Sequence, residues 1–182
     1  MDFEKILPIV LSEFKKENIR YALMGGVAMA AWGVVRATVD LDCLVMHEDM
    51  EKIEKIMNKY SYRCVYKTEN ISQYISDVKI YGSIDFLHAF REISRLMIKR
   101  AVNKKVFSNQ YEVMILLPED LIGLKVQALA NDPEREMKEK MDIEAIVSAL
   151  AQKLDWKIIE KYYKILSREK DYGILRNKYV KP

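Results

Sequence analysis

Residues 21–45 read YALMGGVAMAAWGVVRATVDLDCLV, and this stretch decides the fold. A short apolar run over residues 20–24 is stopped by Gly25 and Gly26, and a small, alanine-rich apolar run follows. That order predicts a strand, a tight turn and a buried helix. Residues 38–45 then place two carboxylates at alternate positions of a β-branched pattern, which predicts a second strand.

The flanking sequence extends this α/β start in both directions. Helical spacing of apolar residues precedes it from Ile6 to Phe14, and acids followed by an apolar stripe predict a helix over residues 48–60. The strand patterns that follow cover residues 62–66, 74–81, 83–87 and 107–117. After Leu117, the sequence Pro118-Glu119-Asp120 is a helix-start signal, and helical patterns dominate to about Leu166.

These patterns together predict an α/β (α+β) fold. We expect a mixed β-sheet core covered by helices over residues 1–117, and a C-terminal helical cap over residues 118–182 that packs on the core as one compact unit. No linker or internal repeat separates the two parts, and 182 residues suit a single domain.

Composition excludes several classes of protein. Half of the residues are apolar and 31% are charged, which is typical of a folded chain and not of a disordered one. No apolar run reaches the length of about 18 residues that a membrane span needs, and the first residues lack a signal-peptide pattern. Cys43 and Cys64 are too few for a disulfide framework, and neither His47 nor His88 has a second ligand at zinc spacing. We therefore expect a cytoplasmic protein, with Cys43 in the core.

Three carboxylates carry the predicted chemistry. Asp40 and Asp42 stand two residues apart in a strand and so point to the same face, while Val39, Leu41 and Cys43 are expected to face the core. Asp85 lies among apolar β-formers, where strand propensity gives no reason for an acid. If its strand pairs beside that of Asp40, the three carboxylates could bracket two Mg²⁺ or Mn²⁺ ions.

The turn at Gly25 and Gly26 suits a phosphate group. Glycines let the backbone approach a ligand closely, and amides at the start of a helix favour an anion. Arg36, four residues before Asp40, either binds a triphosphate or is an ordinary surface arginine.

The combined motif resembles the signature of the DNA polymerase β-like nucleotidyltransferase superfamily. It comprises Leu23-Met24-Gly25-Gly26, thirteen intervening residues, and Asp40-Leu41-Asp42-Cys43, with a third acid on a later strand. Within the superfamily, the chain is similar to small members close to the AbiEii toxin group, which share an Arg shortly before the carboxylate pair, here Arg36-Ala37-Thr38. The segments 118–125 and 140–143 are similar to that group's lysine and aspartate motifs. Val27 departs from the pattern, because toxin relatives often have Ser there.

This resemblance implies transfer of a nucleoside monophosphate from an NTP to an acceptor hydroxyl. It implies metal binding by Asp40, Asp42 and Asp85, with catalysis by the same three acids and Lys125. The nucleotide contacts that it implies are Gly25, Gly26, Arg36, Thr38, Lys125 and Asp142. Lys125 lies inside an apolar helical stripe, so its ammonium either snorkels to water or meets an anionic partner such as Asp142.

Two further hypotheses use the same residues differently. A catalytically silent member of the fold would bind nucleotide, or a partner protein, as a regulatory module; the absence of a hydroxyl at Val27 favours it. A metal-dependent nuclease would use the acids but would not need the glycine turn or Arg36.

The acceptor is predicted from charge. Residues 91–110 hold six Lys or Arg against one acid, Glu92, and are locally +5, although the whole chain carries only +3. Such a segment either guides a phosphate backbone or is a solvated helix face. Because it follows the strand of Asp85, we expect RNA, such as a tRNA end, as acceptor. The toxin resemblance adds a cognate protein partner.

Overall fold

The computed structural model describes residues 1–180 and divides into two compact units. The first comprises Met1–Ala31 and Val35–Leu116, and the second comprises Trp32–Val34 and Leu117–Pro182. Lys181 and Pro182, the end of the predicted helical cap, lie outside the described residues. No helix within residues 1–180 combines the length and the apolar character that crossing a bilayer requires.

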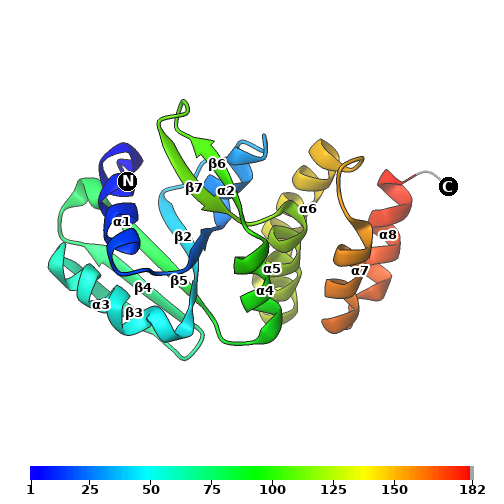
Figure 1. The fold of residues 1–182 in the computed structure, drawn as a ribbon. Helices are drawn as coiled ribbons and strands as arrows, with labels where there is room; N and C mark the ends of the chain where they lie inside the picture. The colour runs from blue at the N-terminus through cyan, green and yellow to red at the C-terminus, as the bar shows by residue number, and fades with distance from the viewer. Residues whose placement is uncertain (181–182) are drawn as a thin grey trace. The chain divides into compact units, whose positions relative to one another are not determined.

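A seven-stranded sheet forms the centre of the first unit (Figure 1). Its strands lie in the order β3-β4-β5-β2-β1-β7-β6. In chain order they are β1 (Tyr21–Leu23), β2 (Asp40–Met46), β3 (Tyr62–Lys67), β4 (Ile71–Ser76), β5 (Ser83–Ala89), β6 (Val102–Val106) and β7 (Tyr111–Ile115). The pairs β2–β5 and β1–β7 are parallel and the other neighbours are antiparallel, so the prediction of a mixed sheet is confirmed.

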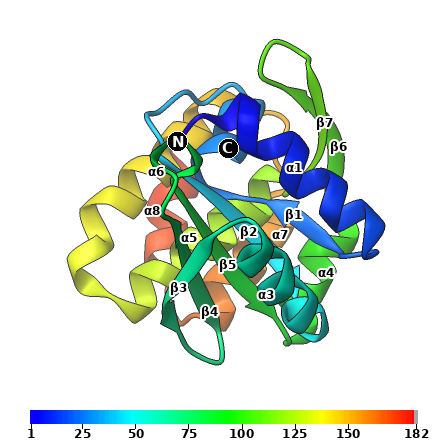
Figure 2. The ribbon, with the colours of Figure 1, turned by 90° about the vertical axis from the view of Figure 1, so that its left-hand side faces the viewer.

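Two helices that lie side by side pack on this sheet, as Figure 2 shows. They are α1 (Phe3–Lys16) and α3 (Met50–Lys59), which follows a 3-10 turn at His47–Asp49. The side chain of Asp2 caps the start of α1 by accepting a hydrogen bond from the amide of Lys5. The ring of Phe14 in α1 lies 6.3 Å from that of Phe86 in β5, both side chains being fully buried. This contact places the core between α1 and the face of β5 that carries Phe86.

Two shorter helices complete the first unit. The helix α2 (Gly25–Ala31) follows β1 and packs on β2, as the glycine turn predicts. The helix α4 (Glu92–Arg100) connects β5 to β6 and packs on β2 and β5.

The second unit is helical. It contains α5 (Pro118–Asn131), a 3-10 turn at Pro133–Arg135, α6 (Glu136–Leu150), α7 (Trp156–Ile165) and α8 (Glu169–Tyr179). The helix α5 packs against α6 and α7, and α7 packs against α8. A Cβ atom at Gly123 would lie 2.7 Å from the ring of Tyr162, so the absence of a side chain there lets α5 and α7 approach closely.

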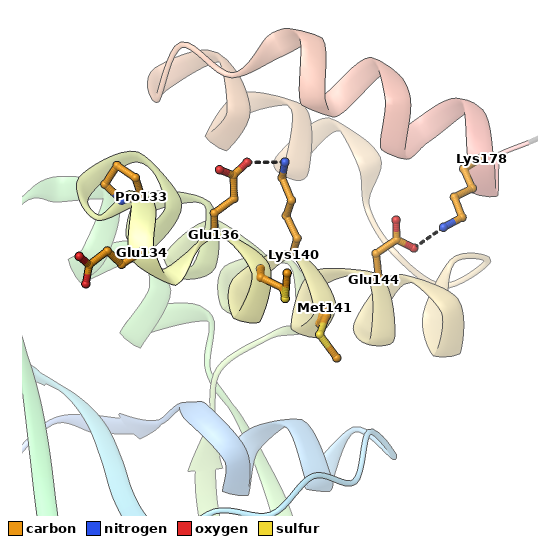
Figure 3. Close-up of a pocket in the computed structure, with 8 residues that line it drawn as sticks. Pro133, Glu134, Glu136, Lys140, Met141, Glu144 and Lys178 are labelled. Atoms are coloured by element: carbon orange, nitrogen blue, oxygen red, sulfur yellow. Dashed lines mark hydrogen bonds and ion pairs between the residues drawn. The ribbon is translucent and has the colours of Figure 1, made fainter.

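A pocket of about 810 Å³ lies on this unit and is lined chiefly by α6; Figure 3 draws its lining side chains. Met137 and Met141 contribute its apolar surface, and the ion pairs Glu136–Lys140 and Glu144–Lys178 flank it. No predicted site residue lines this pocket.

Several predicted elements were wrong. The strand predicted over residues 74–81 is β4, which begins at Ile71 and ends at Ser76; a 3-10 turn at Lys79–Tyr81 and Gly82, with φ of +63°, follow it. The helix α4 and strand β6 were not predicted, because cations dominate the pattern of residues 91–105. Val39 does not face the core: it precedes β2 and is 70% exposed. The helix α8 lies within the predicted helical cap, although the helical pattern itself was followed only to about Leu166.

Candidate active site

The three predicted carboxylates lie on adjacent strands. Asp42 of β2 is directly opposite Asp85 of β5 in the parallel register, and Asp40 is opposite Ser83. Neighbouring strands are about 4.8 Å apart, and residues two apart in a strand share a face. Asp40, Asp42 and Asp85 therefore project from one face of the sheet, and the predicted pairing of their strands is confirmed. The intervening side chains Leu41 and Cys43 are fully buried on the other face.

Asp85 is half-buried and has a hydrogen-bond partner that was not predicted. The side-chain amide of Gln73 donates a hydrogen bond of 3.0 Å from Nε2 to Asp85 Oδ2. Burial raises the pKa of the Asp85 carboxyl, the amide of Gln73 acts in the opposite direction, and the negative charge of Asp40 raises it further. A carboxyl with a raised pKa is better suited to accept a proton.

The glycine turn lies against the carboxylates. Gly25 has φ of +62°, and a Cβ atom built on it would lie 1.8 Å from Asp42 Oδ2. The amide of Met24 also donates a hydrogen bond of 2.9 Å to the carbonyl of Asp42. A Cβ atom on Gly26 would lie 2.5 Å from that of Thr38. Each glycine thus leaves room for one specific side chain just before or within β2.

A cavity of about 480 Å³ adjoins this turn. Three predicted nucleotide contacts line it, namely Gly26, Arg36 and Thr38, whereas Gly25 and the three carboxylates do not. Lys105 and the tip of the β6–β7 hairpin, residues 107–109, also line the cavity. Phe107, Ser108 and Asn109 all have positive φ, between 49° and 65°, which non-glycine residues adopt rarely. Lys105 was predicted only as part of the basic segment, and its place in this cavity was not predicted.

Lys125 and Asp142 belong to the second unit, where they form a buried ion pair. Lys125 Nζ also lies 3.0 Å from Glu139 Oε2, and Arg135 contacts the other oxygen of Glu139 at 2.5 Å. Lys125 therefore meets two anionic partners in the interior and does not snorkel to water. Glu139 was not predicted, although it lies three residues before Asp142 on the same side of α6.

The cations of residues 91–110 do not form a uniform exposed patch. Arg95 binds both carboxylate oxygens of Glu48, at 2.8 and 2.9 Å. This hydrogen bonding lowers the pKa of Glu48 to about 2. Arg91 lies over the ring of Phe90, and Lys99 and Lys105 are exposed.

Comparison with known families identifies the class of protein. A family model described as an uncharacterised nucleotidyltransferase matches residues 3–172. The chain belongs to this nucleotidyltransferase family. No curated protein sequence matches the chain.

Solved nucleotidyltransferase structures share the fold. The solution structure of the antibiotic-resistance factor ANT(2'')-Ia superposes with a TM-score of 0.67 at 15% identity, covering 98% of each chain. The crystal structure of ANT(2'')-Ia with adenylyl-2''-tobramycin gives a TM-score of 0.64 at 16% identity, covering 96% of this chain and 97% of that one. The lincomycin-bound lincosamide adenylyltransferase LnuA gives a TM-score of 0.53 at 15% identity, covering 80% of this chain and 97% of that one. At these identities the likeness establishes the fold, and the family match establishes a nucleotidyltransferase.

The donor chemistry of the acids fits a hard divalent cation. Asp40, Asp42 and Asp85 supply only carboxylate oxygens, which Mg²⁺ and Mn²⁺ prefer. Within residues 1–180, however, no three His, Cys, Asp or Glu side chains are gathered closely enough to form a ready-made ion site. The three carboxylates nevertheless share one face of the sheet and one donor chemistry.

Proposed function

We propose that this nucleotidyltransferase is a metal-dependent enzyme that transfers NMP from an NTP to an acceptor hydroxyl. The observation that carries the proposal is the register of β2 and β5, which puts Asp42 opposite Asp85 with Asp40 on the same face. Asp40, Asp42 and Asp85 are the metal ligands in this proposal. A divalent ion bound there would neutralise charge on the phosphates and stabilise the entering and leaving oxygens.

Asp85 acts as the base in the proposed reaction. The acceptor hydroxyl gives its proton to Asp85 while its oxygen attacks the α-phosphorus, forming a new phosphorus–oxygen bond. The bond from the α-phosphorus to the bridging oxygen of the β-phosphate breaks, and pyrophosphate leaves with the electron pair. The proton on Asp85 then passes to water, so the net products are the NMP ester, pyrophosphate and a proton.

The cavity beside the turn is the proposed nucleotide site. Arg36 and Lys105 supply positive charge, Thr38 supplies a hydroxyl, and Gly26 leaves room for close approach to the backbone. Its volume is within the range of about 300 to 1,000 Å³ that is usual for ligand pockets. Gly25 has a different role in this proposal, because it keeps space for the carboxylate of Asp42.

Lys125 and Asp142 are proposed as a second nucleotide contact. Asp142 would hold the ammonium of Lys125, and a nucleotide phosphate would replace Glu139 as the other anionic partner. Lys125→Met should then raise KM for the NTP. An unchanged KM would limit Lys125 to stabilising the second unit.

The decisive experiment is incubation with each α-labelled NTP, Mg²⁺ or Mn²⁺, and candidate acceptors. We expect label to be transferred by the wild-type protein and not by Asp42→Asn. Nucleotide binding without a divalent ion and without transfer would favour the silent binding module. Release of nucleotides from RNA without added NTP would favour a nuclease.

RNA remains the proposed acceptor on the basis of charge. Exposed Lys99 and half-buried Lys104 are the cations to test, and Lys105 is left unchanged because it lines the proposed nucleotide site. Phosphate contacts release counterions, so log K for single strands should fall with log salt by roughly 0.7 per contact. Lys99→Glu with Lys104→Glu should flatten this slope and leave NTP affinity unchanged. A salt-independent affinity, or an unaltered slope in the double variant, would remove RNA as the choice.

A small hydroxylated acceptor is the second candidate. The supporting observation is that the structure of ANT(2'')-Ia in complex with adenylyl-2''-tobramycin covers 96% of this chain. Label transferred to tobramycin or lincomycin, and not to RNA, would replace the RNA proposal with this one.

The resemblance to the AbiEii group adds a proposed role as a toxin in the cytoplasm. Induced expression of the wild-type protein should then arrest growth, and Asp42→Asn, made to the same level, should not. Growth arrest by both proteins would separate toxicity from nucleotidyl transfer.

A further inference from the structure

Gln73 of β4 is directly opposite Asp85 of β5 in the antiparallel register. Its Nε2 atom donates a 3.0 Å hydrogen bond to Asp85 Oδ2. Within the described part of the chain, Gln73 is the one side chain that hydrogen-bonds Asp85. This hydrogen bond engages Oδ2, one of the two carboxylate oxygens of Asp85.

The position of Gln73 is unusual for its strand. Its neighbours on the same face of β4 are Ile71 and Ile75, while Ser72 and Tyr74 are fully buried on the opposite face. An apolar β-branched side chain would continue the pattern on this face. At this position a half-buried amide is hydrogen-bonded to the acid directly opposite. We infer that the amide is present because it bonds Asp85, and not because the sheet needs it for packing.

An amide has a chemical advantage over a cation here. Lys or Arg would form an ion pair with Asp85 and offset the negative charge that a divalent ion needs. Gln donates a hydrogen bond and carries no charge, so it fixes the carboxyl plane and leaves the charge in place. Groups that hydrogen-bond to a metal-ligating carboxylate in this way commonly orient it.

We propose that Gln73 is a positioning residue for nucleotidyl transfer, holding Asp85 with Oδ1 toward the acceptor hydroxyl and the metal site. The inference rests on the proposed function, because it takes Asp85 as base and ligand. Loss of such an outer partner typically costs about 10- to 100-fold in metal affinity or activity.

The test uses three variants of the full-length protein. Gln73→Leu removes the donor at similar volume, Gln73→Asn keeps the amide but shortens its reach, and Gln152→Leu is the matched control at an exposed position of the second unit. The measurements are kcat and KM for the NTP, Mn²⁺ affinity by calorimetry, and Tm.

We expect Gln73→Leu to lower kcat by about 10- to 100-fold and to weaken Mn²⁺ binding by about 10-fold. KM for the NTP and Tm should remain close to the wild-type values. Gln73→Asn should also lower kcat and weaken Mn²⁺ binding. Gln152→Leu should match wild type in every measurement.

Failure of the inference differs from failure of the proposed function. Wild-type kcat and Mn²⁺ affinity in both Gln73 variants would overturn the role of Gln73 alone. A fall in kcat that follows a fall in Tm would make Gln73 a structural residue, and would also overturn the inference. If the wild-type protein neither transfers label nor binds Mn²⁺, the proposed function fails, and the role of Gln73 fails with it.

Discussion

Replacing Gly25 by alanine should inactivate the enzyme through Asp42. Gly25 begins α2 with φ of +62°, and its missing side chain leaves the space that Asp42 Oδ2 occupies. Gly25→Ala adds one methyl group at the contact between the turn and the carboxylate. The substitution therefore tests whether the turn positions the proposed metal ligand.

The structure sets the size of the effect. The added Cβ atom would lie 1.8 Å from Asp42 Oδ2, and real Cβ contacts are essentially never shorter than 3.0 Å. The carboxylate or the turn must therefore move by more than 1 Å, and a 1 Å misplacement can cost about 100-fold in rate. Left-handed backbone adds about 1 to 2 kcal/mol for a residue with a Cβ atom. In a chain of this size, each kcal/mol of lost stability lowers Tm by roughly 2 to 4 °C.

Gly33→Ala is the matched control. Gly33 also has positive φ, +85°, but a Cβ atom there would have no neighbour within 4 Å. Both variants carry the stability cost of a left-handed backbone, whereas only Gly25→Ala also carries the collision with Asp42 and should lose about 100-fold in kcat/KM in the labelled-NTP assay. Equal activity in the two variants, or an additional 100-fold loss on adding Asp42→Ala to Gly25→Ala, would refute the reasoning.

Three further predictions concern the first unit. Phe86→Ala should lower the free energy of unfolding by about 3 to 5 kcal/mol in urea, because Phe86 is fully buried; a loss below about 1 kcal/mol would place it outside the core. The pKa of Glu13 is lowered to about 2, first by its hydrogen bond to Lys16, so its contribution to stability is present above pH 4.5 and disappears as the pH falls towards 2. Glu13→Gln should therefore be less stable than wild type at pH 7, and parallel melts should show no difference near pH 2. One thiol per native chain should react with a disulfide reagent, since Cys64 is exposed, whereas Cys43 is buried and burial raises its pKa; two fast-reacting thiols would contradict this.

The carboxylates and the glycine turn could be predicted from sequence because their chemistry is local. The alternation of Asp40 and Asp42 fixes which face they share, and two adjacent glycines after a short apolar run mark a turn. The mixed sheet followed from the same patterns. Grouping Asp85 with these acids was conditional on its strand pairing beside that of Asp40, and the structure confirms this pairing.

Gln73 and Lys105 could not be found in this way, because their places depend on tertiary pairing. The predicted strand began at Tyr74, one residue after Gln73, so the amide fell in a connection and its register against Asp85 was invisible. Lys105 was counted among the cations of a basic segment. Its place in the cavity depends on the hairpin tip at residues 107–109. All three residues of this tip adopt positive φ, and none of them is a glycine that would have indicated the turn from sequence.

The spacing between the glycine turn and the acids has a physical reason in this fold. A Cβ atom at Gly25 would collide with Asp42 and one at Gly26 would collide with Thr38, while the amide of Met24 donates a hydrogen bond to the carbonyl of Asp42. The thirteen intervening residues thus form a loop and a helix whose two ends are fixed against each other at three points. A side chain added at either glycine must displace the residue opposite, and that residue is either a proposed metal ligand or a proposed nucleotide contact. The turn and the acids therefore work as one unit, in which the backbone of the turn sets the position of the carboxylate.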